Sequence, residues 1–110
     1  MKKIEAIIKP FEVEEVRDAL SEIGIDGMTL SEVRGVIGQA DRAELKGFES
    51  TFDYLPKVKI EVVVTDSRAQ EAVNAVLKGA QTGNGDTKIF VTRVDQVVRI
   101  RTEERNELAI

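Results

Sequence analysis

The sequence predicts one small α+β domain, in which two β-α-β units share an antiparallel sheet and place both helices on one of its faces. Its 110 residues allow a single domain with one core. Two stretches alternate with the period of a strand, and two others carry the apolar stripe of a helix. These elements follow one another in the order strand, helix, strand, and that order then repeats.

The first unit begins with a strand, because apolar residues alternate with others between Lys3 and Ile8. A helix follows, with its apolar stripe formed by Val13, Val16, Ala19, Leu20 and Ile23. Pro10 opens this helical region, where the missing amide hydrogen costs nothing, and Gly24 is a typical helix stop. A second strand is expected at 28–35.

The second unit repeats this order. Its first strand turns one alternating set toward the core, namely Val58, Ile60, Val62 and Val64. The next helix has a stripe of Ala69, Ala72, Val73, Val76 and Leu77, and ends at Gly79. Ser67 and Gln70 are spaced as a capping box at its start. Further strands are expected at 88–94 and, as a short final strand, at 97–101. Two such units in one small chain predict a ferredoxin-like fold.

Composition excludes several classes of function. The formal net charge of -4 argues against a general nucleic-acid binder, which would need a basic surplus. The chain has neither cysteine nor histidine, which excludes disulfides, thiolate zinc sites and cysteine nucleophiles and removes the commonest general base. No run approaches the roughly 20 apolar residues of a membrane span. Residues 1–5 do not read as a signal peptide, so we expect a cytoplasmic protein with no membrane insertion.

Two features of the predicted fold suggest contacts with other molecules. The sheet face without helices mixes apolar residues, such as Ile7 and Val63, with charges, and we favour its use in oligomerisation over simple contact with water. The connection 36–54 is also far longer than the roughly 4–6 residues usual in a compact domain. We favour a partner-binding or ligand-gated loop over a tolerated surface insertion.

Segment 81–88 and two arginines are candidate anion-binding groups. The segment contains two glycines, whose flexible backbone can turn N–H groups toward an anion, and ends at Lys88. A plain turn explains it equally well. Arg99 and Arg101 stand two apart on the predicted final strand, so they would leave from one face as a pair suited to phosphate or carboxylate. The alternative is a charged edge strand or ordinary surface ion pairs.

The remaining charged residues give no catalytic pattern. Lys57 and Lys59 share a strand face with Glu61, which suits an organic acid but also an ordinary solvated face. The carboxylates of the first helical region are expected on its solvent side, namely Glu12, Glu14, Glu15 and Asp18. We therefore expect no enzyme, although an acylphosphatase-like hydrolase on the same fold stays open.

Six segments in this order resemble the P-II nitrogen signalling family over essentially the whole chain. They are MKKIEAIIKPFEVEEVRDAL, GIDGMTLSEVRG, LPKVKIEVVV, AQTG, GD-x-KIFV and VVRIRT. The resemblance implies a homotrimer of one domain, 1–110, that binds ATP or ADP in the clefts between subunits and senses 2-oxoglutarate with Mg²⁺. It also implies a B-loop at 81–88, a C-terminal tail at 102–110 and a T-loop at 36–54. The T-loop would dock on targets such as an ammonium transporter, which would recruit the protein to a membrane, or glutamine synthetase and its regulators.

The resemblance also implies roles for single positions. The nucleotide-binding positions would be Thr29, Gly35, Gly38, Val63, Thr82, Gly85, Asp86, Thr87, Lys88, Arg99 and Arg101. Among them, Lys88, Arg99 and Arg101 would hold the phosphates, while Thr29 and the backbone near Val63 would meet the adenine. Gln39 and Lys57 match the residues that address 2-oxoglutarate, and Gln39 also addresses the metal ion.

The chain departs from the family pattern at both loops. The B-loop is one residue shorter than T-G-x-x-G-D-G-K, and Thr87 replaces a glycine that lets the backbone lie against phosphate. The usual Gly-Arg-Gln appears at 37–39 without its arginine, and 44–48 lacks the tyrosine that many bacterial members have uridylylated. Two alternatives follow: a P-II-like sensor of adenylate or another metabolite such as inorganic carbon, and a CutA-like trimeric scaffold without nucleotide function.

Overall fold

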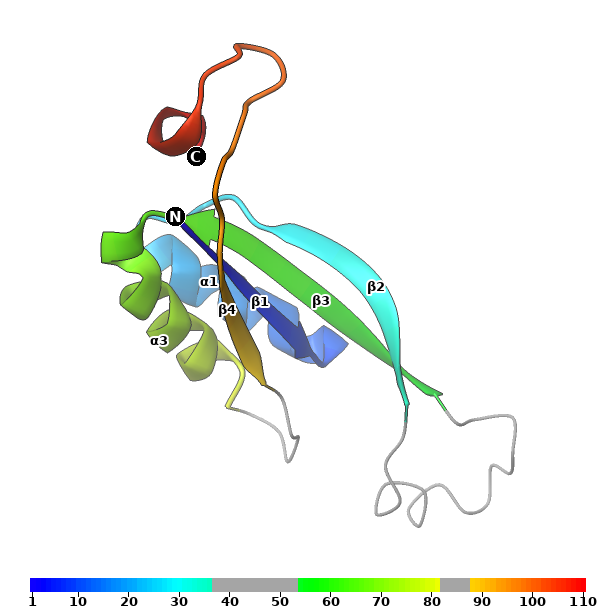
Figure 1. Cartoon of the computed structure of the whole chain (residues 1–110). Coiled ribbons are helices and arrows are strands. Elements are labelled where there is room, and N and C mark those ends of the chain that lie inside the picture. The colour runs from blue at the N-terminus through cyan, green and yellow to red at the C-terminus, as the bar shows by residue number, and fades with distance from the viewer. Residues whose placement is uncertain (37–53, 82–87) are drawn as a thin grey trace, which may run out of the picture.

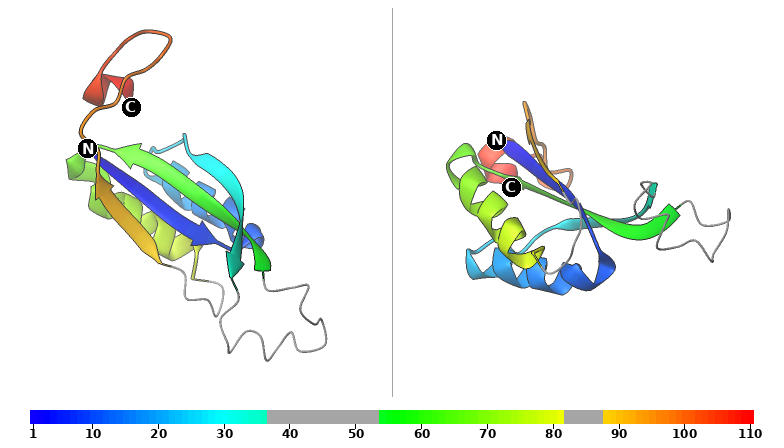
Figure 2. Two further views of the ribbon diagram at one scale, coloured as in Figure 1. Left: turned by 45° about the vertical axis from the view of Figure 1, so that its right-hand side comes forward. Right: turned by 90° about the horizontal axis from the view of Figure 1, so that it is seen from below.

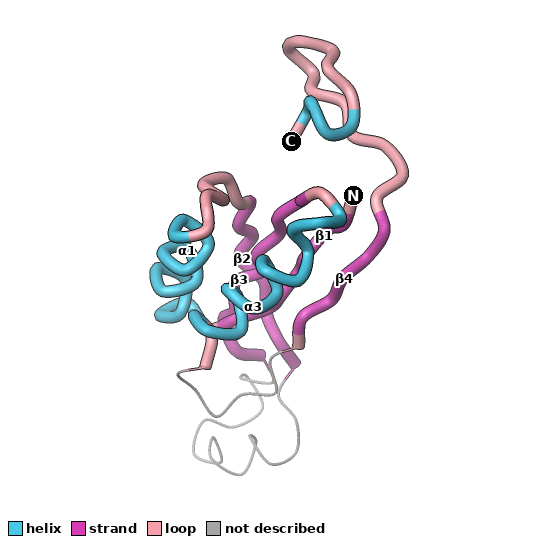
Figure 3. Tube along the Cα trace, turned by 90° about the vertical axis from the view of Figure 1, so that its left-hand side faces the viewer, coloured by secondary structure: helices cyan, strands magenta, loops and turns pink. Residues whose placement is uncertain are grey.

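The computed structural model describes residues 1–36, 54–81 and 88–110. In chain order its elements are β1 (Lys2–Ile8), a 3-10 helix (Pro10–Glu12), α1 (Val13–Glu22), β2 (Thr29–Val36), β3 (Tyr54–Val64), a 3-10 helix (Asp66–Arg68), α3 (Ala69–Gly79), β4 (Ile89–Arg93) and a 3-10 helix (Asn106–Ala109). The strands form an antiparallel sheet in the order β2-β3-β1-β4. Both helices lie on one face of it (Figures 1 and 3). The predicted ferredoxin-like α+β fold is confirmed.

The core lies between the sheet and the two helices. Of the alternating residues predicted to face inward, Ile4, Ala6 and Ile8 on β1 and Ile60, Val62 and Val64 on β3 are buried, and Val58 is partly buried. They pack with the buried stripes of α1 and α3, which include Val16, Leu20, Ala72 and Val76. The helices meet closely at Gly79, where an added Cβ would lie 2.6 Å from Val16 Cα. This layer holds the sheet in place but leaves its other face uncovered (Figure 2).

The predicted stop of the first helix is confirmed. Gly24 has a φ of 82°, a conformation that glycine adopts without steric cost. Its N–H bonds to the carbonyl of Ser21, and the N–H of Ile25 bonds to that of Leu20, both at 2.9 Å. This pair of bonds is the Schellman motif, which satisfies carbonyls at a helix end.

The start of the first helical region corrects one expectation. Glu12 was expected on the solvent side, yet only 2% of its surface is exposed. Its carboxylate accepts a hydrogen bond from the N–H of Lys9 at 2.9 Å. The side chain turns back because the 3-10 turn that precedes α1 leaves a backbone donor to be satisfied there.

The predicted capping box of α3 is wrong. Ser67 Oγ lies 3.2 Å from Thr65 Oγ1, and Gln70 Nε2 donates to Asn74 Oδ1 at 3.1 Å. Neither side chain caps the helix, because the 3-10 turn Asp66–Arg68 comes first and places Ser67 inside that turn.

The predicted final strand at 97–101 is also wrong. The chain leaves the sheet after β4 and turns back on itself away from the helices (Figure 1). Its only ladder contact among the described residues is a single antiparallel bridge between Val98 and Arg105. Ile100 at the turn is 95% exposed, so this segment has no core to pack against within the described chain.

No helix in the described ranges combines the length and the hydropathy needed to cross a membrane.

Candidate functional site

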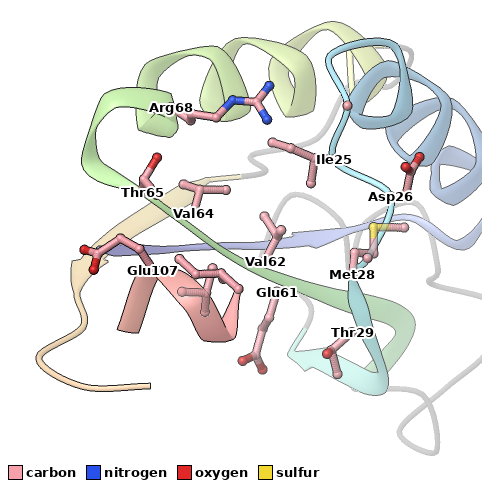
Figure 4. A pocket seen from close by; sticks show the side chains of 14 residues that line it. Ile25, Asp26, Met28, Thr29, Glu61, Val62, Val64, Thr65, Arg68 and Glu107 are labelled. Atoms are coloured by element: carbon pink, nitrogen blue, oxygen red, sulfur yellow. The ribbon is translucent and has the colours of Figure 1, made fainter. Parts of the chain in front are cut away.

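A hollow beside the end of β3 is the best candidate site among the described residues (Figure 4). Its volume is about 640 Å³, within the roughly 300–1,000 Å³ typical of small-molecule sites. The lining comes from three parts of the chain: the connection 24–29, the end of β3 with the turn after it (61–65 and Arg68), and Glu107 and Ile110 of the tail. Thr29 and Val63, the two positions expected near adenine, both line it.

The sheet register explains why these two residues line the same hollow. Thr29 is paired with Glu61, and Val63 follows two positions later on the same face of β3. That face is the one without helices, since the alternate residues Val62 and Val64 are buried in the core. The hollow therefore lies along β3 beyond its pairing with Thr29, where side chains from both faces of that strand border the connection from α1 to β2.

Arg68 and Ser21 hold the connection 24–29 in place. The hydroxyl of Ser21 donates to Asp26 Oδ1 at 2.9 Å. The guanidinium of Arg68 donates to the carbonyl of Ile23 and, through Nε, to Glu71 Oε1 at 3.0 Å. This wall of the hollow is thus tied to both helices.

Charges on the open sheet face are paired with one another. Glu5 and Glu61 are directly opposite across β1 and β3, which alone would be unfavourable. Lys59 Nζ lies 3.9 Å from Glu5 Oε2 and 3.6 Å from Glu61 Oε1, and Lys3 Nζ lies 3.8 Å from Glu61 Oε2. Lys59 therefore neutralises carboxylates of its own chain. This favours an ordinary solvated strand face at Lys59 over a site for an organic acid.

Lys57 and Gly35 are neighbours further along the same face. A Cβ added at Gly35 would lie 3.4 Å from Lys57 Cγ, so the lysine stem lies over the glycine. Of the positions with expected ligand roles, the structure thus brings together two pairs: Thr29 with Val63, and Gly35 with Lys57.

The three expected phosphate-binding residues are not brought together within one chain. Lys88 precedes β4, whereas Arg99 and Arg101 follow it, at the other end of the strand. Arg99 donates to the carbonyl of Ala109 at 3.3 Å and lies 3.7 Å from Glu104 Oε1. The expectation that Arg99 and Arg101 share a strand face is wrong, because Arg101 lies in the turn.

Several expected residues lie outside the described ranges. They are Gly38, Gln39, Thr82, Gly85, Asp86 and Thr87, together with most of the T-loop 36–54 and of the B-loop 81–88. Within the described ranges, no group of three or more acidic side chains gathers as a candidate metal site.

The sequence reasoning assigned no ligand role to several of the lining residues, among them Glu61, Arg68, Glu107 and Ile110. Glu61 had a signal in the sequence, since it shares a strand face with Lys57 and Lys59, but its place in the hollow depends on the pairing of β3 with β2. Arg68 and the tail residues reach the hollow only through tertiary structure, for which the sequence carries no local signal.

The turn after β3 is held by ion pairs at Asp66. The Met1 ammonium lies 2.8 Å from Asp66 Oδ1, and Lys2 Nζ lies 3.1 Å from the same atom. The hydrogen bond from the Met1 ammonium, followed by that from Lys2, lowers the pKa of Asp66 from its ordinary value. These contacts tie the start of β1 to the turn that carries Thr65 and Arg68.

Comparison with known proteins places the chain in a family. The family model described as nitrogen regulatory protein P-II matches residues 1–104. The nitrogen regulatory protein P-II of Pasteurella multocida is 55% identical over all of both chains, and nitrogen regulatory protein P-II 1 of Escherichia coli K12 is 53% identical over the same extent. The crystal structure of Arabidopsis thaliana PII bound to citrate aligns with a TM-score of 0.81 and 40% identity, covering 99% of this chain and 91% of that one. The chain therefore belongs to the P-II family of nitrogen regulatory proteins.

Proposed function

We propose that this chain acts as a homotrimeric signal-transduction protein that binds ATP or ADP between its subunits. One observation carries the proposal: Thr29 and Val63 line a hollow of suitable size, while Lys88 and the two arginines stand at opposite ends of β4. A nucleotide needs an adenine pocket and cations for its phosphates at one place. A second copy of the chain supplies the missing cations.

The open face of the sheet supports assembly into an oligomer. Ile7 is 38% exposed and Phe90 is 48% exposed there, beside the balanced charges of β1 and β3. Exposed apolar residues that gather on one face often mark a contact with another protein, and the helices cover only the opposite face. Subunit contact buries them without needing any change in the fold.

The hollow also fits an adenylate by chemistry. Met28 and Val63 offer apolar contact to a purine ring, and Thr29 offers a hydroxyl next to it. Lys88, Arg99 and Arg101 are all exposed and therefore accessible to a ligand's phosphates, for which Arg99 would exchange its contacts with Glu104 and Ala109. When bound, ATP with Mg²⁺ would present its phosphates to these cations and to the B-loop.

An organic acid, 2-oxoglutarate, is the proposed second ligand. Lys57 lies beside Gly35 near the start of the T-loop. Gly35 has no side chain, so the aliphatic stem of Lys57 packs directly over the glycine backbone. Its ammonium suits a carboxylate, and Gln39 would complete the site with Mg²⁺. The similar Arabidopsis PII is bound to citrate, which is likewise a small organic acid.

The output of the proposed sensor is control of other proteins through the T-loop 36–54. The flanking strands pair as far as Val36 opposite Tyr54, so the loop begins at the far end of a long two-stranded arm. We propose ammonium transporters, glutamine synthetase or its regulators as targets, contacted from the cytoplasm. No catalytic step is proposed, in keeping with a family of regulatory proteins.

Isothermal titration with ATP and with ADP, each with and without Mg²⁺ and 2-oxoglutarate, tests the proposal. Binding of ATP that 2-oxoglutarate strengthens is the expected result. Binding that ignores 2-oxoglutarate would favour a sensor of adenylate or of another metabolite, and no binding would favour a scaffold. Light scattering after size exclusion measures the oligomer in the same samples, and a monomer would contradict the shared site.

A further inference from the structure

We propose that Arg68 is a positioning residue for the nucleotide site, because it fixes the wall of the hollow formed by 24–29. This inference rests on the proposed function, since it takes the nucleotide as the ligand. It adds a residue from the start of α3 to a site otherwise built from β3 with the turn after it, the α1–β2 connection and the tail.

Arg68 spans the gap between the two helices. Its Nη2 donates to the carbonyl of Ile23, the residue after α1, and its Nε donates to Glu71 Oε1 at 3.0 Å. Figure 4 shows the side chain extending from the start of α3 toward Ile25. Glu71 lies on the first turn of α3, so the orientation of the guanidinium is fixed from its own helix.

The carbonyl of Ile23 needs this donor. The Schellman bonds of α1 use the carbonyls of Leu20 and Ser21 and leave that of Ile23 beyond the helix end. The last turn of α1 contains no basic residue, although positive charge there is favourable. Arg68 supplies both the hydrogen bond and the charge from another element.

The contact sits where the chain changes direction. Gly24 follows Ile23 directly and has a φ of 82°, so the path of 24–29 depends on how this peptide is held. Without Arg68, the Schellman bonds, the bond from Ser21 to Asp26 and the packing of Ile25 and Met28 against the core would be left to restrain the wall. A wall that varies in position binds a rigid purine less tightly, because part of the binding free energy goes into ordering it.

Arg68 acts through the wall and not as a phosphate ligand. Two of its nitrogen atoms already donate to protein groups, and its side chain is 35% exposed. Its effect should therefore be the same for every adenine nucleotide, whereas the effect of a phosphate ligand grows with the number of phosphates.

The test compares Arg68→Ala and Arg68→Lys with Lys78→Ala as the matched control. Lys78 also joins α3 to α1, through Glu22 at 3.2 Å, but both side chains are exposed and neither lines the hollow. We expect Arg68→Ala to weaken ATP and ADP alike, by roughly three- to tenfold, as for one lost hydrogen bond from a charged group. In Arg68→Ala, amide hydrogen exchange at 24–28 should become faster. Arg68→Lys should recover part of the nucleotide affinity. Lys78→Ala should change neither the nucleotide affinity nor the exchange rate.

The outcomes separate this inference from the proposed function. If the wild type binds nucleotide and Arg68→Ala binds it with the same affinity, the inference is overturned and the proposed function is not. The same holds if Arg68→Ala loses more affinity for ATP than for ADP. Wild-type protein that binds neither nucleotide overturns the proposed function and the inference with it. If Arg68→Ala does not fold, Glu71→Gln replaces it, and unchanged affinity and exchange in that variant overturn the inference.

Discussion

The body of the molecule and its C-terminal segment, 94–110, use apolar residues in opposite ways. In the body, Ile4 is 1% exposed, because the sheet and both helices surround it. In the C-terminal segment, Ile100 is 95% and Leu108 is 73% exposed. The body buries a core of its own, although Ile7 and Phe90 stay partly exposed on its open sheet face, whereas the C-terminal segment buries none of its large apolar side chains within the described chain. We infer that the segment is built for contact with something outside its own chain, and the proposed trimer offers that contact.

The largest expected effect comes from replacing one isoleucine of the body with alanine, compared with the same replacement in the C-terminal segment. Ile4→Ala should lower the free energy of unfolding by about 2–5 kcal/mol, because it leaves a cavity in a packed core. Ile100→Ala should leave the unfolding of the isolated chain almost unchanged, since little surface is buried there. Urea unfolding at low protein concentration measures both. A loss at Ile100 comparable to that at Ile4 would remove the contrast between the two regions.

A smaller effect is expected from Arg101→Ala, which probes the segment for ligand binding instead of stability. Arg101 is exposed at the turn of the segment, so its removal should not change the urea midpoint. The loss of one charged contact to phosphate should weaken ATP binding about tenfold. Calorimetry checks the affinity, with Arg105→Ala, another exposed arginine of the segment, as the comparison. Equal losses in the two variants would point to general charge and not to a specific phosphate contact.

The smallest effect concerns Asp66, which ties the body together at the start of β1. Its pKa is lowered from 3.8 by the Met1 ammonium and Lys2, so the unfolded chain binds its proton more readily than the folded one. The stabilisation is therefore present above pH 3.8 and is lost as the pH falls through the lowered folded value. Asp66→Asn should flatten the acid limb of the stability profile.

Thermal unfolding across that acidic range measures the difference between wild type and variant. High salt should shrink the difference, because Asp66 is exposed and its ion pairs are screened. If stability depends on pH in the same way in the two proteins, contacts other than those of Asp66 hold the turn after β3.

The strands and helices of the body could be predicted because each carries its own periodic pattern. The alternation in β1 and β3 and the stripes of α1 and α3 mark one buried face, and burial of that face determines the fold. The end of α1 was also predictable, since Gly24 favours the left-handed conformation that a helix end requires.

The predictions that were wrong concern segments whose local sequence pattern is compatible with more than one structure. Ser67 and Gln70 have capping-box spacing, but the 3-10 turn before α3 gives the backbone another way to start the helix. Residues 97–101 read as a strand, yet a strand needs a neighbour, and this segment bridges to itself at Val98 and Arg105. The sequence pattern places Glu12 on the solvent side of the helix, and only the structure shows that its carboxylate accepts a hydrogen bond from the N–H of Lys9.

By itself, the sequence determined the element order, the buried faces and the resemblance to the P-II family, because all three depend on patterns along the chain. Only the tertiary structure decided which residues meet at the hollow. Thr29 and Val63 line one hollow through the register of β2 on β3, and Arg68 joins the start of α3 to Ile23 at the end of α1. Register and helix packing join residues that are distant in sequence, and the free energy that selects them comes from the whole core and from no single segment.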